Sequence, residues 1–91
     1  MNKKEILITS ATRTAVGSLS GSLKNISSDE LGSAVISKAI NNSKIKNTDV
    51  DEIIMGQVLT ACAGQNPARQ AAMKSGIPKE KPAYIVNQVC G

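Results

Sequence analysis

The residue best suited to covalent chemistry is Cys90, which follows the apolar run 83–89 and precedes Gly91. A thiol that leaves a strand into a glycine-containing turn is well placed to act as a nucleophile. A helix starting just beyond it would favour the reactive thiolate, and the amides of that helix would bond an oxyanion on a sulfur-bound acyl group. The alternative is that Cys90 is a small buried hydrophobe at a strand end. The local pattern leaves both interpretations open.

Four other side chains could take part in chemistry or binding. Cys62 lies in a loop of small residues, where we interpret it as structural filler. Arg13 follows the first apolar run, where α/β proteins often place binding groups, and an anchoring salt bridge or carbonyl contact is the alternative. Arg69 and Gln70 begin the second expected helix and either bind a ligand or hold a neighbouring loop.

Composition argues against several classes of protein. The sequence has no His and only two Cys, so a protein-only zinc site is not expected. Its formal net charge is +4, but the cations are scattered, which does not fit a nucleic-acid-binding surface. It also lacks the run of about eighteen apolar residues that a membrane span needs, and it has no glycine-rich phosphate loop.

These absences lead to expectations about location and ligands. With no export signal, we expect a cytoplasmic protein whose two thiols are reduced. We expect no nucleic-acid partner, no membrane partner and no bound cofactor or metal.

The expected elements alternate between strands and helices. Short aliphatic and β-branched runs predict buried strands, and two amphipathic segments predict helices. In chain order they are a strand at 5–9, a helix from 27–30 to 41–42, a strand at 53–59, a helix from 66–67 to 76 and a strand at 83–89. Crossovers of this length make the strands parallel, giving a βαβαβ unit of the α/β class. Two helices would leave much of such a sheet bare.

Both helix starts carry capping signals. Ser27 and Glu30 have the spacing of a capping box, in which each side chain bonds the backbone amide of the other residue. Asn66 is a favoured N-cap, and Pro67 fits the first helical position because its missing N–H has no partner there anyway.

Four motifs, in order, resemble the start of a thiolase of the acetyl-CoA acetyltransferase branch. They are Arg13-Thr14-Ala15-Val16-Gly17 with Gly21 and Leu23, then Gly56-Gln57-Val58-Leu59, then Gly64-Gln65-Asn66-Pro67-Ala68-Arg69-Gln70-Ala71-Ala72, and finally Asn87-Gln88-Val89-Cys90-Gly91. The resemblance covers all 91 residues but about the first quarter of a family member. It implies a five-layered αβαβα fold, mainly parallel, of which residues 1–91 form the N-terminal part of the first half-domain.

The resemblance also implies an activity. Cys90 matches the nucleophile that takes the acyl group from one acyl-CoA, and its backbone N–H matches one oxyanion-hole donor. A second acyl-CoA then attacks the acyl-cysteine in a Claisen condensation, or the reverse thiolysis occurs. Acetyl-CoA, acetoacetyl-CoA and CoA are thus the expected substrates and products, in fatty acid and acetoacetyl-CoA metabolism. The family forms dimers or tetramers, so a homo-oligomer, such as a homotetramer, is expected.

Three questions stay open at this point. The histidines and second cysteine that the family needs are not among these residues, so we expect the segment alone to be inactive and to act with downstream chain. A non-catalytic fragment that folds only with a complementary segment is one alternative, and a ketoacyl-synthase-type condensing enzyme is another. The direction of the reaction and the acyl chain length are not decided by the sequence.

Overall fold

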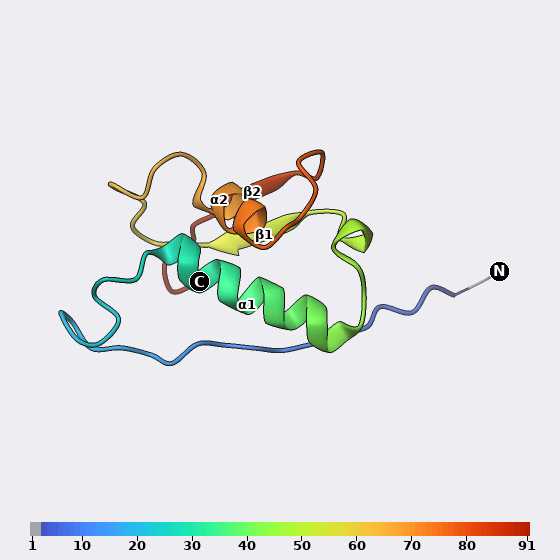
Figure 1. Ribbon diagram of the computed structural model, residues 1–91, viewed down its shortest axis with the longest axis horizontal. Helices are drawn as coiled ribbons and strands as arrows, with labels where there is room; N and C mark the ends of the chain where they lie inside the picture. Colours follow the sequence, from blue (N-terminus) through green and yellow to red (C-terminus); the bar gives the residue numbers. More distant parts are fainter. Residues whose placement is uncertain (1–2) are drawn as a thin grey trace.

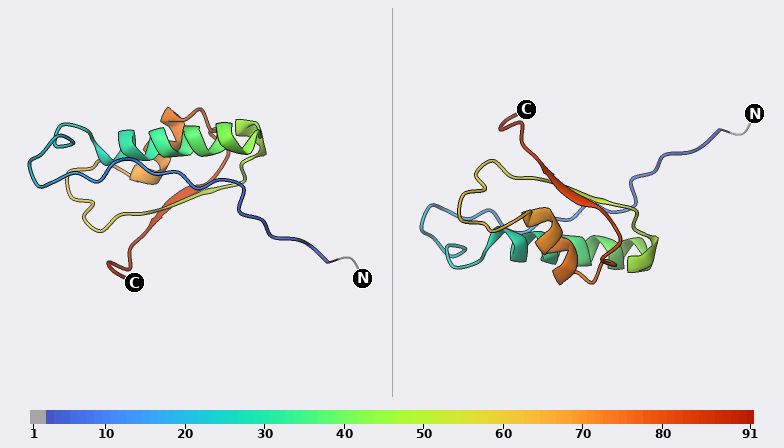
Figure 2. Two further views of the ribbon diagram at one scale, coloured as in Figure 1. Left: turned by 90° about the horizontal axis from the view of Figure 1, so that it is seen from below. Right: turned by 90° about the horizontal axis from the view of Figure 1, so that it is seen from above.

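The computed structural model describes residues 3–91, which form a helical layer on a two-stranded sheet (Figure 1). The strands β1 and β2 are parallel, with Ile53 opposite Ala83 and Gly56 opposite Val86. Both helices lie on the same face of the sheet (Figure 2). In chain order the elements are α1 (Ser28–Ser43), the 3-10 helix η1 (Asn47–Asp49), β1 (Ile53–Gly56), α2 (Pro67–Lys74) and β2 (Ala83–Val86).

Helix α2 supplies most of the core, and its buried residues are small. Ala68 and Ala71 are completely buried and Ala72 is nearly so, as is Ile77, which follows the helix. Opposite them on α1 lies Gly32, where an added Cβ would be only 3.1 Å from the Cβ of Ala71. The two helices therefore approach closely because the residues between them are small.

The predicted ends of α2 are confirmed. Asn66 adopts a left-handed backbone conformation with φ of 43°, and its Oδ1 accepts a hydrogen bond from the Arg69 amide at 3.1 Å. Its Nδ2 donates to the Ala83 carbonyl at 2.9 Å, which ties the helix start to the start of β2. At the other end, Gly76 has a φ of +80°, and Asn47 donates to its carbonyl oxygen at 3.1 Å.

Helix α1 begins where the sequence predicts, but not through the predicted capping box. Ser27 is the N-cap residue, yet its side chain accepts no bond from the first turn. The Asp29 carboxylate instead pairs with Lys74 of α2 at 2.5 Å. The Lys74 ammonium and, second, the Ser27 hydroxyl lower the pKa of Asp29. The start of α1 is thus joined to α2 through the Asp29–Lys74 ion pair instead of being closed by a capping box.

The prediction of a strand at residues 5–9 is wrong for this chain. Ile6 and Ile8 are more than nine-tenths exposed, and no strand of residues 3–91 pairs with the segment. The chain runs extended beside α1, where the Thr12 hydroxyl donates to the Val35 carbonyl at 3.1 Å. A hollow lined in part by Thr12 and Ile53 lies between residues 10–12 and β1. Strand composition without a hydrogen-bonding neighbour leaves an extended, unpaired chain.

The other two predicted strands form but are shorter than expected, since β1 ends at Gly56 and β2 at Val86. Their outward residues Ile54, Tyr84 and Val86 are between 44 and 51% exposed. The sheet is therefore covered on one face only, as two helices on one side dictate. Residues 3–91 therefore form one helical layer and one two-stranded sheet.

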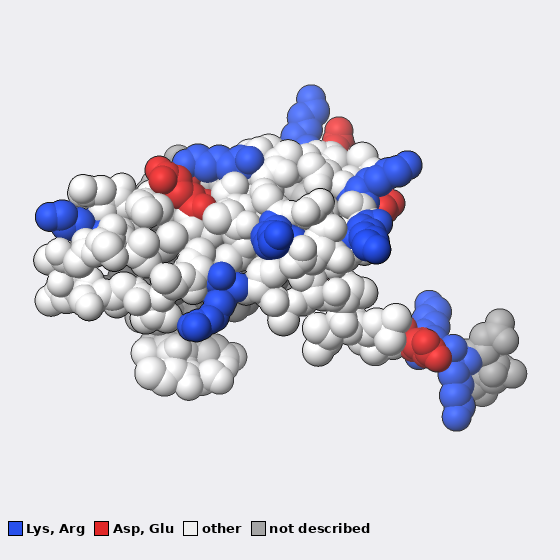
Figure 3. Space-filling view, turned by 60° about the horizontal axis from the view of Figure 1, so that its bottom comes forward, with Lys and Arg blue, Asp and Glu red and all other residues white. Residues whose placement is uncertain are grey.

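The charges on the surface are dispersed. Figure 3 shows lysines and arginines spread over the face that it presents, some of them next to an acidic side chain, with no single large basic patch. No helix within residues 3–91 combines the length and the apolar character that crossing a bilayer requires. The same residues contain no group of three or more side chains arranged to hold a metal ion.

Candidate functional site

The carboxyl ends of β1 and β2 lie side by side, because parallel strands point the same way. The Gln57 amide donates to the Val86 carbonyl at 3.3 Å, which continues the ladder one residue past β1. Beyond this bond, the segments that follow β1 and β2 diverge around a hollow of about 550 Å³. Its lining consists of the last residue of each strand and the residues that follow it, namely Gly56, Gln57, Val58, Val86, Asn87, Gln88, Val89 and Gly91.

Cys90 lies on a tight turn between Val89 and Gly91, two of the residues that line this hollow. The Gly91 amide donates to the Gln88 carbonyl at 2.8 Å and closes the turn. Cys90 is exposed and its thiol is free. Cys90 is therefore not buried among residues 3–91, although the hollow itself is lined by its neighbours Val89 and Gly91.

The backbone just before the thiol is in an unusual conformation. Val89 has a φ of 53°, in the left-handed region that β-branched residues rarely adopt. Such a conformation costs about 1–3 kcal/mol and persists only where neighbouring contacts hold it.

Asn87 provides those contacts, and sequence reasoning gave it no role. Its Oδ1 accepts a hydrogen bond from the Val89 amide at 3.0 Å, and its Nδ2 donates to the Val58 carbonyl at 2.7 Å. The tendency of Asn to bond the backbone two residues ahead is the signal that predicts the first bond. The second bond joins residues 29 apart in the sequence, so no local signal predicts it.

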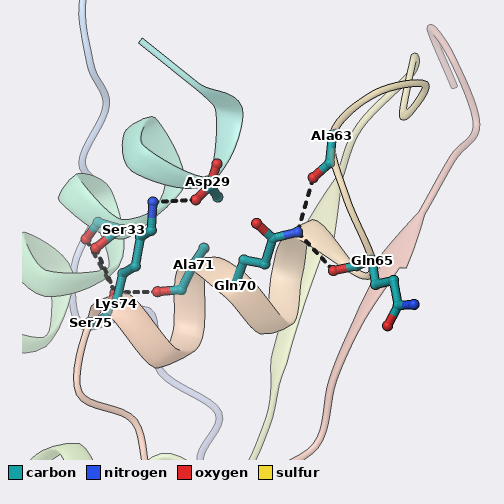
Figure 4. A network of polar contacts seen from close by, with 8 residues as sticks. All are labelled: Asp29, Ser33, Ala63, Gln65, Gln70, Ala71, Lys74 and Ser75. Atoms are coloured by element: carbon teal, nitrogen blue, oxygen red, sulfur yellow. Dashed lines mark hydrogen bonds and ion pairs between the residues drawn. The ribbon is translucent and has the colours of Figure 1, made fainter.

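Arg69 and Gln70 hold loops, which was one of their two predicted roles. The Gln70 side-chain nitrogen donates to the carbonyls of Ala63 and Gln65, at 2.9 and 2.8 Å (Figure 4). Arg69 Nη1 donates to the carbonyls of Lys79 and Lys81, at 2.8 and 3.1 Å. Figure 4 also shows Lys74 reaching back to Asp29, so α2 is joined to its surroundings along its length.

Arg13 and Cys62 do not join the Cys90 turn. Arg13 is exposed and lines a second hollow, between residues 12–16 and helix α1, that also touches Gly56 and Gln57. No ion pair of Arg13 occurs within residues 3–91, so the predicted anchoring salt bridge is not formed there. Cys62 is exposed on its loop with a left-handed φ of 62°, rather than packed as filler.

The profile of the thiolase N-terminal domain matches residues 6–91, nearly all of the sequence. The chain belongs to the thiolase family. It is 54% identical over 87 residues to the acetyl-CoA acetyltransferase of Cupriavidus necator. It is also 52% identical over all 91 residues to the enzyme of that name from Rhizobium meliloti. The predicted thiolase resemblance is thereby confirmed, including its acetyl-CoA acetyltransferase branch.

The fold agrees with a solved member of the family. The Acat5 thiolase of Ascaris suum, whose crystal structure contains coenzyme A, superposes with a TM-score of 0.84 and 38% identity over 86% of this chain. This thiolase segment covers 20% of that chain and 22 to 23% of the two curated relatives. The predicted α/β portion of a thiolase fold is thus confirmed, and the sequence spans about a fifth of the length of these relatives.

Proposed function

We propose that this chain carries the acyl-accepting cysteine of an acetyl-CoA C-acetyltransferase. The observation that carries the proposal is the exposed thiol of Cys90 on a turn at the carboxyl ends of two parallel strands, in a chain of the thiolase family. The relatives named acetyl-CoA acetyltransferase support a CoA thioester as the substrate. They favour it over the acyl-carrier-protein thioester that a ketoacyl-synthase-type enzyme uses.

The proposed chemistry has two transfers. The Cys90 thiolate attacks the carbonyl carbon of acetyl-CoA, the bond to the CoA sulfur breaks, and CoA leaves as a thiolate that takes a proton. A second acetyl-CoA, deprotonated at its α-carbon, then attacks the acetyl-cysteine. The new carbon–carbon bond gives acetoacetyl-CoA and returns the Cys90 thiolate. Covalent transfer divides one difficult step into two easier ones.

The 91 residues alone lack part of this machinery. They contain no His, so they supply no imidazole to move the protons in these steps. We therefore propose that catalysis requires the downstream chain of a complete polypeptide, which would form dimers or tetramers in the cytoplasm. The sheet face with Ile54, Tyr84 and Val86 exposed is consistent with a segment that needs further chain beside it.

Trapping of an acetyl group tests the proposal. The protein as its cell makes it is mixed with radiolabelled acetyl-CoA, quenched in acid, digested and mapped for labelled peptides. We expect the label on the peptide with Cys90, and its loss in Cys90→Ala. Cys62→Ala is the matched control, because it removes the other exposed thiol and leaves the label in place. Label that persists in Cys90→Ala would contradict the assignment.

A further inference from the structure

The turn that presents Cys90 is fixed by one side chain acting in two directions. Asn87 accepts a hydrogen bond from the Val89 amide at 3.0 Å, which holds the backbone immediately before the thiol. It donates another to the Val58 carbonyl at 2.7 Å, on the chain that leaves the neighbouring strand. The Asn87 amide thus spans the gap between the two strand ends.

The bond to Val89 holds a conformation that the sequence would not adopt freely. Val89 has a φ of 53°, and a β-branched residue pays a steric cost there. Removing the Oδ1 acceptor leaves the Val89 amide without this partner. Without this bond, Val89 should relax toward a negative φ, and this change would move Cys90.

The bond to Val58 connects the turn to the sheet. Val58 directly follows Gln57, whose amide is bonded to the Val86 carbonyl, so the carbonyl that Asn87 contacts belongs to a chain segment held at the end of β1. Without this bond the Cys90 turn is joined to the sheet only through its own backbone. A misplacement of about 1 Å can reduce the rate of a positioned reaction roughly 100-fold.

We infer that Asn87 is a positioning residue for the Cys90 thiol in acyl transfer, an inference that rests on the proposed function. Asn87 does not take part in bond making. It sets the direction of the thiol by fixing the turn on one side and the sheet end on the other. Its loss should therefore slow the acylation of Cys90 without weakening the binding of the CoA thioester.

The test compares three variants of the protein as its cell makes it. Asn87→Ala removes both bonds. Asn87→Ser keeps a hydroxyl able to accept from the Val89 amide but is too short to reach Val58. Asn42→Ala is the matched control, because Asn42 is an exposed asparagine on α1, far along the chain from the turn. For each variant, the single-turnover rate of acetyl transfer is measured as a function of the concentration of labelled acetyl-CoA. The rate is divided by the folded fraction of the protein, which circular dichroism gives.

We expect Asn87→Ala to lower the maximal acylation rate about 10- to 100-fold while the half-saturating concentration stays within about twofold. Asn87→Ser should recover part of that loss, and Asn42→Ala should match the unmodified protein. Equal rates for Asn87→Ala and Asn42→Ala would overturn the inference. So would a loss of folded protein in both Asn87 variants, since it would assign Asn87 to the fold rather than to the turn.

The proposed function fails in a different way. If Cys90→Ala still accepts the acetyl group, the nucleophile is wrong and the role of Asn87 goes with it. If Cys90→Ala loses the label while Asn87→Ala acylates at the normal rate, the nucleophile stands and only the positioning role is overturned.

Discussion

Helix α2 buries small apolar side chains, whereas the N-terminal segment 3–26 leaves larger ones exposed. The helix buries Ala68 and Ala71 completely, whereas Ile6 and Ile8 in the segment are more than nine-tenths exposed. An isoleucine has far more apolar surface to remove from water than an alanine. Burial in this molecule therefore follows from which elements lie alongside, and not from the hydrophobicity of the residue.

The two regions also differ in how they are held. Helix α2 has a capping asparagine at its start, a glycine and Asn47 at its end, and the Lys74 to Asp29 ion pair to α1. The described N-terminal segment is hydrogen-bonded to α1 through two hydroxyl groups, those of Thr9 and Thr12. Changes of similar size should consequently have very different effects in the two regions.

The largest difference is expected for an enlarged alanine. Ala71→Leu adds three carbon atoms where a Cβ on Gly32 would already be only 3.1 Å away. Overpacking of a filled core typically costs about 1–3 kcal/mol, and we expect the upper end here because both helices must move. Urea unfolding followed by far-ultraviolet circular dichroism measures it.

Ala15→Leu is the matched control in the other region. Ala15 is exposed, so the same enlargement should change the free energy of unfolding by less than about 0.5 kcal/mol. Similar losses for Ala71→Leu and Ala15→Leu would contradict this difference, because they would mean that the segment is as closely packed as the helix.

An intermediate effect is expected at the start of α2. Asn66→Ala removes the bond to the Arg69 amide and the bond to the Ala83 carbonyl, and it places alanine at a φ of 43°. Loss of the cap costs about 1 kcal/mol and the backbone conformation about 1 more, so we expect a destabilisation of about 2 kcal/mol. The same urea titration measures this loss.

Asn66→Asp separates the two bonds. The carboxylate keeps an acceptor for the Arg69 amide and tolerates the left-handed conformation, but it loses the donor to the Ala83 carbonyl, so the loss should be smaller than that of alanine. An aspartate variant as unstable as the alanine variant would mean that the tie to β2, and not the cap, stabilises α2.

The same contrast explains what the sequence can and cannot predict. The limits of α2 follow from Asn66, Pro67 and Gly76, since caps and turns act within a few residues. The strand predicted at 5–9 fails because a strand needs a partner, and composition does not say whether one lies alongside. Local signals are sufficient for the helices and insufficient for the sheet edge.

The candidate site divides in the same manner. Cys90 is predicted as a candidate from its motif and from its place after an apolar run, both of which are local. The Asn87 bond to Val58 depends on two parallel strands ending together, which only the folded chain brings about. Arg69 and Gln70 belong to a specific family motif, yet their contacts are to loop carbonyls, so a motif does not by itself separate binding from architecture.

The smallest effect is expected at Ile8, where the same substitution can be measured with and without further chain. In the 91-residue chain, Ile8→Ala removes a side chain that is 92% exposed, so the free energy of unfolding should change by less than about 0.5 kcal/mol. Burial of the same isoleucine would instead make the change cost about 2–5 kcal/mol. Measuring Ile8→Ala in the 91-residue chain and in a longer polypeptide that contains it therefore tells whether further chain covers the segment. A loss of that size in the 91-residue chain itself would contradict the exposed position, since only buried side chains are so costly to truncate.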